Sequence, residues 1–229
     1  MQIYLDLDGP ILDVSRRYYA IYSDLLNRAG YRPLDQASYW SLKRLSFQES
    51  AIVGHSCPSG FVEDYLVERQ NLIEDPAYLS LDNPHSGVLQ HLENWRETHE
   101  LTLVTLRRNY QSLVSQLDFV GIRRLLADVL VGSIGCPGWR AKKERIETSL
   151  RDANNALVIG DTETDVLAAH ALELPSVAVT CGIRTRRLLA HLAPNLLVRD
   201  LGELHIDRWP VVCHGSELRS RLLNAALTI

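Results

Sequence analysis

Two aspartates one residue apart, Asp6 and Asp8, end a short apolar run near the start of the chain and are followed by Gly9 and Pro10. The length and apolar pattern of the run predict a buried strand from Ile3, and the Gly-Pro pair predicts a turn after it. If the strand continues through both aspartates, their carboxylates point to the same side. Two such carboxylates repel one another unless a cation lies between them, one takes up a proton, or both point into water. A pair of turn or capping aspartates without chemistry is the simpler alternative for this stretch alone.

Other polar residues follow later predicted strands. Thr105 comes directly after the apolar run 101–104, Asp161 and Asp165 follow another apolar strand, and Lys142 lies in a helix between them. In open α/β sheets, ligands bind beyond the carboxyl ends of the strands, so we expect these side chains to meet the two N-terminal aspartates there. Aspartate oxygens are hard ligands of the kind that Mg²⁺ prefers. A threonine with neighbouring backbone N–H groups can bind phosphoryl oxygens, a lysine can neutralise developing charge, and an aspartate can attack phosphorus to form an aspartyl-phosphate.

The composition is that of a folded protein with ordinary charge. The chain has 229 residues, 46% of them hydrophobic, a net charge of −4 and an isoelectric point near 6.1. This length suits one large or two small domains, and the charge provides no electrostatic basis for binding nucleic acid or a membrane. The four cysteines form no C-x-x-C motif, which argues against a zinc or redox site and favours a reducing compartment; they are Cys57, Cys136, Cys181 and Cys213. Because we find neither a signal peptide nor an apolar stretch that could cross a bilayer, we expect a soluble cytoplasmic protein.

The pattern of secondary structure changes near residue 80. Up to that point the sequence predicts helices and no convincing strand, and the predicted helices cover 14–29, 46–53 and 61–73. The second of these starts at a capping-box spacing from Ser46 to Glu49, and Pro76 ends the third.

After a break at 82–87, strands and helices alternate. The predicted strands are 101–105, 128–131, 156–159, 176–179 and 195–198, and the predicted helices are 85–97, 109–117, 141–150, 164–172 and 184–192. This alternation predicts an α/β fold with a doubly wound, Rossmann-like parallel sheet. We assign 1–13 and 80–204 to this core, 14–79 to a helical insertion, and leave the tail 205–229 unassigned.

These motifs together resemble the haloacid dehalogenase-like hydrolase superfamily, in particular its phosphoglycolate-phosphatase-like members with a helical cap. The resemblance depends on D-L-D-G at Asp6–Gly9, V-T-L-R at Val104–Arg107, Lys142, and G-D-T-E-T-D at Gly160–Asp165. Each motif is weak by itself, but all four occur in the family's order, and the helical insertion lies where this group carries its cap. The resemblance spans roughly residues 1–204 and makes 14–79 a cap.

The resemblance implies a role for each motif residue. Asp6 would be the nucleophile and a metal ligand, and Asp8 the general acid and base with its backbone carbonyl on the metal. Thr105 and Leu106 would bind phosphate, and Lys142 would bridge the nucleophile and the phosphate. Asp161 would hold Mg²⁺, Asp165 would support the metal site directly or through water, and Arg107 is a candidate substrate contact.

Several readings of these residues stay open. Lys143 is the alternative to Lys142, although Glu144 and Ile146 fit the family's K-x-E-x-I spacing better from Lys142. The family usually has Thr or Ser where this chain has Pro10. Asp161, Asp165 and Thr105 could be helix caps, and Arg107 a surface charge. For five residues of the insertion, a solvated helix face is the first expectation and a position in the cleft the second; these are Arg16, Arg17, Lys43, Arg44 and His55.

The function that the sequence predicts is a magnesium-dependent phosphatase that hydrolyses a small phosphorylated metabolite through an aspartyl-phosphate. Retention of Asp8 favours phosphoester hydrolysis over cleavage of carbon–halogen bonds. The alternatives are a phosphosugar mutase of the same fold and a non-catalytic binding protein. A phospho-receiver domain uses similar residues, but in a different order. The sequence predicts neither the substrate nor the oligomeric state.

Overall fold

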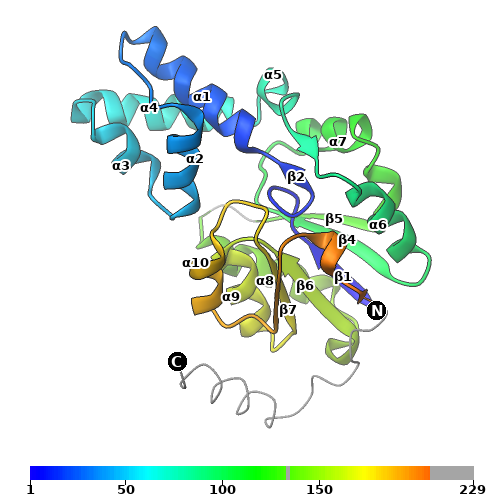
Figure 1. The fold of residues 1–229 in the computed structure, drawn as a ribbon. Coiled ribbons are helices and arrows are strands. Elements are labelled where there is room, and N and C mark those ends of the chain that lie inside the picture. The colour runs from blue at the N-terminus through cyan, green and yellow to red at the C-terminus, as the bar shows by residue number, and fades with distance from the viewer. Residues whose placement is uncertain (133–134, 207–229) are drawn as a thin grey trace.

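The computed structural model of the chain describes residues 1–132 and 135–206, so the predicted tail lies outside the described residues from 207 onward. A parallel sheet forms its centre, with the strand order β5-β4-β1-β6-β7-β8 (Figure 1). Its strands are β1 (Gln2–Leu5), β4 (Glu100–Thr105), β5 (Asp128–Val131), β6 (Ala156–Gly160), β7 (Ser176–Val179) and β8 (Leu196–Val198). The predicted α/β fold with a doubly wound parallel sheet is confirmed.

The first strand lies in the middle of this sheet. Its residue Ile3 is opposite Leu101 of β4 on one side and Leu157 of β6 on the other. From β1 the strand order continues to β4 and β5 in one direction, and the later strands continue from β6 in the other. The carboxyl ends of β1, β4 and β6 therefore surround the point where the winding reverses, which is the usual ligand site of such sheets.

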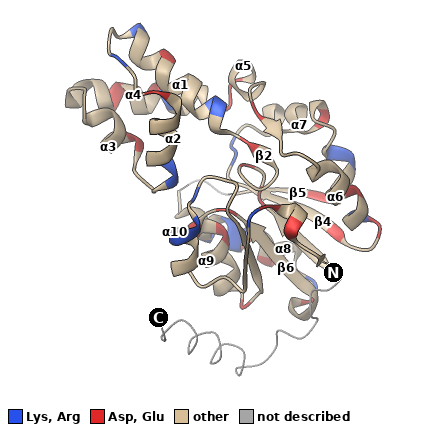
Figure 2. Ribbon diagram, in the orientation of Figure 1, with Lys and Arg blue, Asp and Glu red and all other residues tan. Residues whose placement is uncertain are grey.

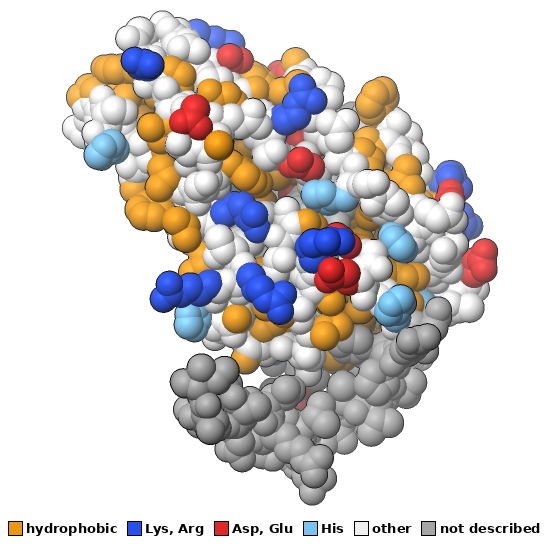
Figure 3. Space-filling view, in the orientation of Figure 1, with side chains coloured by type: hydrophobic (Ala, Val, Ile, Leu, Met, Phe, Trp, Pro, Cys, Tyr) orange, Lys and Arg blue, Asp and Glu red, His pale blue; other side chains and the backbone are white. Residues whose placement is uncertain are grey.

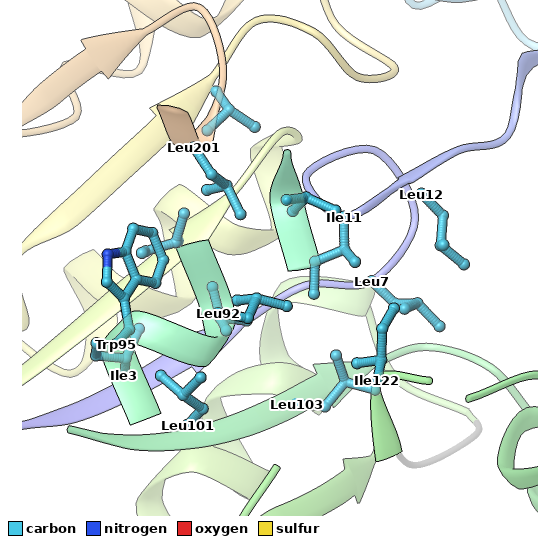
Figure 4. Close-up of a cluster of buried hydrophobic side chains, with 14 of the residues drawn as sticks. Ile3, Leu7, Ile11, Leu12, Leu92, Trp95, Leu101, Leu103, Ile122 and Leu201 are labelled. Atoms are coloured by element: carbon cyan, nitrogen blue, oxygen red, sulfur yellow. The ribbon is translucent and has the colours of Figure 1, made fainter. Parts of the chain in front are cut away.

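Alternate side chains of β1 are buried on opposite faces of the sheet. Ile3 and Leu5 pack with α6 (Val88–Arg96) and α7 (Tyr110–Phe119), in the cluster shown in part in Figure 4. Tyr4 belongs to a second cluster with side chains of α8 (Gly138–Ser149) and α9 (Glu163–Ala171). Burial of both faces explains why these strands read as continuous apolar runs. It also holds the strand ends in fixed positions.

The helices between β1 and β4 form a separate layer. They are α1 (Ser15–Arg28), α2 (Gln36–Arg44), α3 (Glu49–Gly54), α4 (Ser59–Leu72) and α5 (Pro76–Leu79), and in Figure 1 α1–α4 lie together away from the sheet. They have a core of their own, which includes Ile21, Tyr22, Tyr39, Val53 and Tyr65. The chain enters and leaves this layer through two short strands that pair antiparallel, β2 (Leu12–Asp13) and β3 (Asn83–Pro84). The last α-helix in the described part of the chain is α10 (Arg186–His191), which packs near α9.

Several sequence predictions for the helical layer were wrong. Helix α2 was missed because Tyr39 is its one buried residue, so its apolar periodicity is weak. The signal that could have found it is Asp35, whose carboxylate accepts a hydrogen bond from the Ser38 amide at 2.9 Å. Pro76 begins α5 instead of ending a helix, since its missing N–H costs nothing at the first helical position.

The predicted capping box from Ser46 to Glu49 does not form. Ser46 has a φ of 68° beyond the end of α2, and Gln48 is the residue that precedes α3. The Glu49 side chain is buried instead, where it pairs with Lys43 at 2.8 Å and with Arg69 at 3.3 Å. Lys43 is therefore largely buried rather than on a solvated helix face. In the described residues no helix is both long enough and apolar enough to span a bilayer.

Candidate active site

Three buried carboxylates meet at the carboxyl end of the central strands. Asp6 directly follows β1, Asp161 directly follows β6, and Asp165 lies in the first turn of α9. One oxygen from each lies within 4.8 Å of the others. The backbone N–H of Asp6 still donates to the Ile159 carbonyl at 3.0 Å, although β1 itself ends at Leu5. The sheet thus places residues from distant parts of the chain at one point.

Lys142 of α8 is the cation that contacts this group. Its Nζ lies 2.8 Å from Asp6 Oδ2 and 2.5 Å from Asp165 Oδ1, and the side chain is buried. Lys143 points elsewhere and pairs with Glu147 on the surface at 2.6 Å. Burial raises the pKa of Asp6 to about 7, against the lowering effect of Lys142. Of the two lysines considered from the sequence, the structure brings Lys142 to Asp6.

Asp161 is held by backbone on two sides. Its Oδ2 accepts a hydrogen bond from the Ile183 amide at 2.5 Å. A Cβ at Gly9 or at Gly182 would lie 2.1 or 2.0 Å from the same oxygen, so the close approach requires glycine at both positions. Burial first, and then the charge of Asp6, raises the pKa of Asp161 well above its ordinary value.

The three carboxylates of Asp6, Asp161 and Asp165 fit a divalent cation. Among the described residues, Asp161 Oδ1 is buried without a hydrogen-bond partner, and Lys142 alone does not balance three carboxylates. Buried carboxylates that face one another are stable only if they are neutralised or coordinate a cation. Hard oxygen donors of this kind suit Mg²⁺.

Asp165 has both oxygens occupied. Oδ1 accepts from Lys142, and Oδ2 accepts from the Thr162 amide at 3.1 Å and from the Thr162 hydroxyl at 2.8 Å. This is the capping box that opens α9. Asp165 therefore fixes Lys142 and the helix start, which fits the supporting role predicted for it.

Thr105 and Leu106 lie at the end of β4, beside β1. The Thr105 side chain is buried, and its hydroxyl accepts from the Arg107 amide at 3.3 Å. Leu106 is exposed, and its methyl groups pack so closely on Gly132 and Gly138 that a Cβ at either position would lie within 3 Å of them. The hydroxyl and this short turn are at the edge where a phosphoryl group would approach Asp6.

The Asp8 carboxylate is not part of the group formed by Asp6, Asp161 and Asp165, and it contacts two arginines. Arg107 donates to its Oδ1 at 2.6 Å and its Oδ2 at 2.9 Å, and Arg17 donates to Oδ2 at 2.8 Å. Burial alone would raise the pKa of Asp8, but the two guanidinium groups outweigh it and hold the pKa well below its usual range. The prediction of a solvated face for Arg17 was wrong, because its side chain is fully buried on the α1 face that meets the core.

A further carboxylate lies behind the two arginines. Asp82, just before β3, is 3.1 Å from Arg17 Nε and 3.4 Å from Arg107 Nη2. Gln116 of α7 donates to Asp82 at 2.9 Å and to the Leu79 carbonyl at 2.9 Å. Burial raises the pKa of Asp82 to about 6. This network connects Asp8 to residues near β2 and β3, the two short strands through which the chain enters and leaves the helical layer.

Comparison with known proteins agrees with this geometry. A family model described as HAD-hydrolase-like matches residues 139–204, which include Lys142 and the Asp161 motif. A phosphoglycolate phosphatase from Synechococcus elongatus is 27% identical over 205 residues, which cover 88% of this chain and 94% of that protein. Another, from Agrobacterium fabrum, is 23% identical over 216 residues, which cover 87% and 88%. The chain is therefore similar to haloacid dehalogenase-like proteins, and to phosphoglycolate phosphatases among them.

Solved structures share the fold of this chain. A haloacid dehalogenase-like family protein from Streptococcus pneumoniae superposes with a TM-score of 0.75 at 15% identity, over 88% of this chain and 95% of that one. A Thermotoga maritima protein provisionally described as a β-phosphoglucomutase gives 0.66 at 15% identity, over 89% and 96%. The resemblance predicted from the four motifs is confirmed.

Three residues around Asp8 have no local sequence pattern that predicts their contact with it. Arg17 and Gln116 lie in helices whose polar residues mostly face solvent, and Asp82 lies in a stretch that reads as a turn. These residues are far apart in the sequence and meet only in the folded protein, so no local spacing could have predicted their contact. Arg107 was noticed through its motif, and it contacts the second motif aspartate.

Proposed function

We propose that this chain is a magnesium-dependent phosphatase that hydrolyses a small phosphomonoester through an aspartyl-phosphate on Asp6. The contact of Lys142 with Asp6 inside the carboxylate group carries this proposal. The relatives named phosphoglycolate phosphatase support the same reaction class, and they favour a short phosphorylated acid as substrate.

Asp6 is oriented for attack by contacts to both oxygens. Oδ1 accepts from the Leu7 amide at 2.8 Å, and Oδ2 lies 2.8 Å from Lys142 Nζ. A nucleophile held in this way needs little reorientation to attack phosphorus. The charge of Lys142 would also stabilise negative charge that develops on the phosphoryl oxygens. Thr105 and the Leu106 amide would bind those oxygens.

The metal ion would be held by Asp6 and Asp161, with Asp165 in support and the Asp8 carbonyl as a further ligand. When bound, Mg²⁺ would neutralise the carboxylates and the charge of the phosphoryl group. Asp161 is positioned for this by the Ile183 amide and by the two glycines beside it.

Asp8 is the proposed acid–base residue. The contacts with Arg17 and Arg107 keep Asp8 deprotonated, so that it can act as a base. It could then take a proton from the water that attacks the aspartyl-phosphate and releases phosphate from Asp6. Donation of a proton to the leaving oxygen would require Asp8 to loosen from at least one arginine. Residues 14–79 would form the cap that covers the site and excludes water.

Phosphate release from a panel of substrates with and without Mg²⁺ tests the proposal. The panel would contain short phosphorylated acids, sugar phosphates, nucleotides and a nitrophenyl phosphate. Asp6→Asn should abolish release while the protein stays folded, and the exposed neighbour Asp13→Asn is the matched control. Undiminished release by Asp6→Asn would contradict the proposed nucleophile, and no release by the unaltered protein from any substrate would favour a binding protein.

A mutase of the same fold is the second candidate, favoured by the similarity to the Thermotoga maritima structure. It would move the phosphoryl group between two hydroxyls of one sugar phosphate rather than release phosphate. Chromatography of the products from the sugar phosphates of the panel distinguishes the two reactions.

A further inference from the structure

The end of α2 contacts the core at the loop between β7 and α10. Arg44, the last residue of α2, donates from Nη2 to the Thr180 carbonyl at 2.5 Å and to the Arg184 carbonyl at 3.2 Å. The Thr185 amide donates to the Arg44 carbonyl at 3.1 Å. Figure 1 shows the lower end of α2 above this loop, and Figure 2 marks the basic residues there.

Arg184 makes the reciprocal contact from the core side. Its Nη1 donates to the Lys43 carbonyl at 3.3 Å, so each arginine binds main chain of the other element. Its Nε and Nη2 pair with both oxygens of Glu163 at 2.8 and 2.7 Å. Glu163 is the first residue of α9, two positions after Asp161. In Figure 3 basic side chains lie along this boundary between the helical layer and the core.

The same loop also holds Asp161. The Ile183 amide donates to Asp161 Oδ2 at 2.5 Å, and Gly182 packs against that carboxylate. Cys181 contacts the Gly9 carbonyl at 3.5 Å. The five consecutive loop residues 180–184 therefore join the end of α2, through Arg44, to a carboxylate of the candidate metal site and to the turn after Asp6.

We propose that Arg44 and Arg184 are positioning residues that couple the closed helical layer to Asp161. When α2 is seated on the loop, the two arginines hold 180–184 so that the Ile183 amide stays on Asp161 and keeps its free oxygen aimed at the metal site. When α2 lifts away, the loop loses these contacts and Asp161 is held less firmly. This inference depends on the proposed function only in taking Asp161 as a metal ligand.

The test compares Arg44→Met with Arg187→Met. Both changes remove one positive charge, but Arg187 is exposed in the first turns of α10 and outside the contact. Amide exchange measured by NMR without metal should be faster at Ile183 in Arg44→Met by about tenfold, as expected for a local opening. The Val158 amide, which donates to the Pro175 carbonyl in the sheet, should be unchanged and reports on global unfolding.

Direct titration with Mn²⁺, followed by electron paramagnetic resonance, gives a second readout that does not require turnover. Arg44→Met should bind Mn²⁺ about tenfold more weakly, the lower end of the range for partners that orient metal ligands. Arg44→Lys keeps a donor for the same carbonyls and should recover most of the affinity. Arg187→Met should match the unaltered protein.

Unchanged Ile183 exchange or unchanged Mn²⁺ affinity in Arg44→Met would overturn the coupling. Equal acceleration at Ile183 and Val158 would also overturn it, since that pattern indicates general destabilisation. Failure of the unaltered protein to release phosphate from any substrate would contradict the proposed function, while the exchange and Mn²⁺ results would still decide this inference.

Discussion

Arg17, in the first helix of the helical layer, pairs with Asp8, two residues beyond the proposed nucleophile, at 2.8 Å. The guanidinium group also reaches Asp82 at 3.1 Å and the Ile73 carbonyl at 2.9 Å. The buried Arg17 side chain thus connects three segments: the turn after β1, the end of α4 and the residue just before β3. The proposed acid–base residue is therefore held by the helical layer as well as by the core.

Replacement of Arg17 by methionine should destabilise the protein strongly. It keeps an unbranched side chain but leaves Asp8 and Asp82 each without one of their cations. Loss of one partner from a buried ion pair costs about 3–5 kcal/mol, and we expect a fall of about 3 kcal/mol because Arg107 remains. The measurement is urea unfolding. The exposed neighbour Arg16→Met should change the free energy of unfolding by less than about 0.5 kcal/mol, and an equal effect of both changes would contradict the network.

Gly9→Ala should disturb Asp161, whereas Gly30→Ala should not. Both glycines have positive φ, 113° and 79°, so both substitutions carry a backbone cost of about 1–2 kcal/mol. A Cβ at Gly9 would also lie 2.1 Å from Asp161 Oδ2, while nothing lies within 4 Å of one at Gly30. We expect Gly9→Ala to lose phosphate release in addition to stability. Similar activities of the two folded variants would show that the contact has no influence on the site.

The buried Glu49 should make the stability of the helical layer depend on pH. Burial alone would raise the pKa of Glu49, but Arg69 and Lys43 outweigh it and lower the pKa below the ordinary value. A carboxyl with a lowered folded pKa contributes stability that is fully present above its unfolded pKa, about 4.3, and is lost as the pH falls through the folded value. Glu49→Gln should therefore reduce the loss of stability that the protein shows as the pH falls from about 6 to below the unfolded pKa.

The control for this effect is the exposed Glu63→Gln in α4. Urea unfolding at each pH is the measurement. If the two glutamine variants lose stability equally on acidification, the Glu49 cluster is not the cause.

Mg²⁺ should stabilise the folded protein through Asp161. A ligand at one hundred times its Kd adds about 2.7 kcal/mol to the free energy of unfolding. Asp161→Asn should lose most of this gain, yet without Mg²⁺ it should be at least as stable as the unaltered protein, because repulsion with Asp6 is removed. Thermal unfolding with Mg²⁺ and with a chelator measures both effects. The exposed Asp64→Asn should retain the full gain, and a gain of equal size in Asp161→Asn would place the metal elsewhere.

The parts of the site that the sequence predicted are those fixed by a single strand and its following turn. Asp6, Thr105 and Asp161 each come at or just after the end of a buried apolar strand, and parallel strands bring their carboxyl ends to one edge. Lys142 could be chosen over Lys143 because the offsets from Lys142 to Glu144 and Ile146 fit the K-x-E-x-I spacing of the family that the chain resembles.

The rest depended on contacts between segments with no shared local pattern. Arg17 reads as a polar helix residue, and only the docking of α1 on the core buries it against Asp8. Glu49 has the spacing of a capping box, but in the structure its side chain is buried. It pairs there with Lys43 of α2 and Arg69 of α4, which are not close to it in the local pattern that predicted the cap. Residues 101–105 show the opposite case, since periodicity alone defined that strand correctly to its last residue.

The most direct test of the proposed mechanism is to trap the phosphorylated residue. The protein would be mixed with Mg²⁺ and a substrate that it hydrolyses, then reduced with borohydride, which converts an aspartyl-phosphate to homoserine, and digested for mass spectrometry. We predict homoserine at position 6, dependent on substrate and absent in Asp6→Asn. Homoserine at another aspartate, or full turnover with Asp6 unmodified under trapping conditions that label a known aspartyl-phosphate enzyme, would contradict the mechanism.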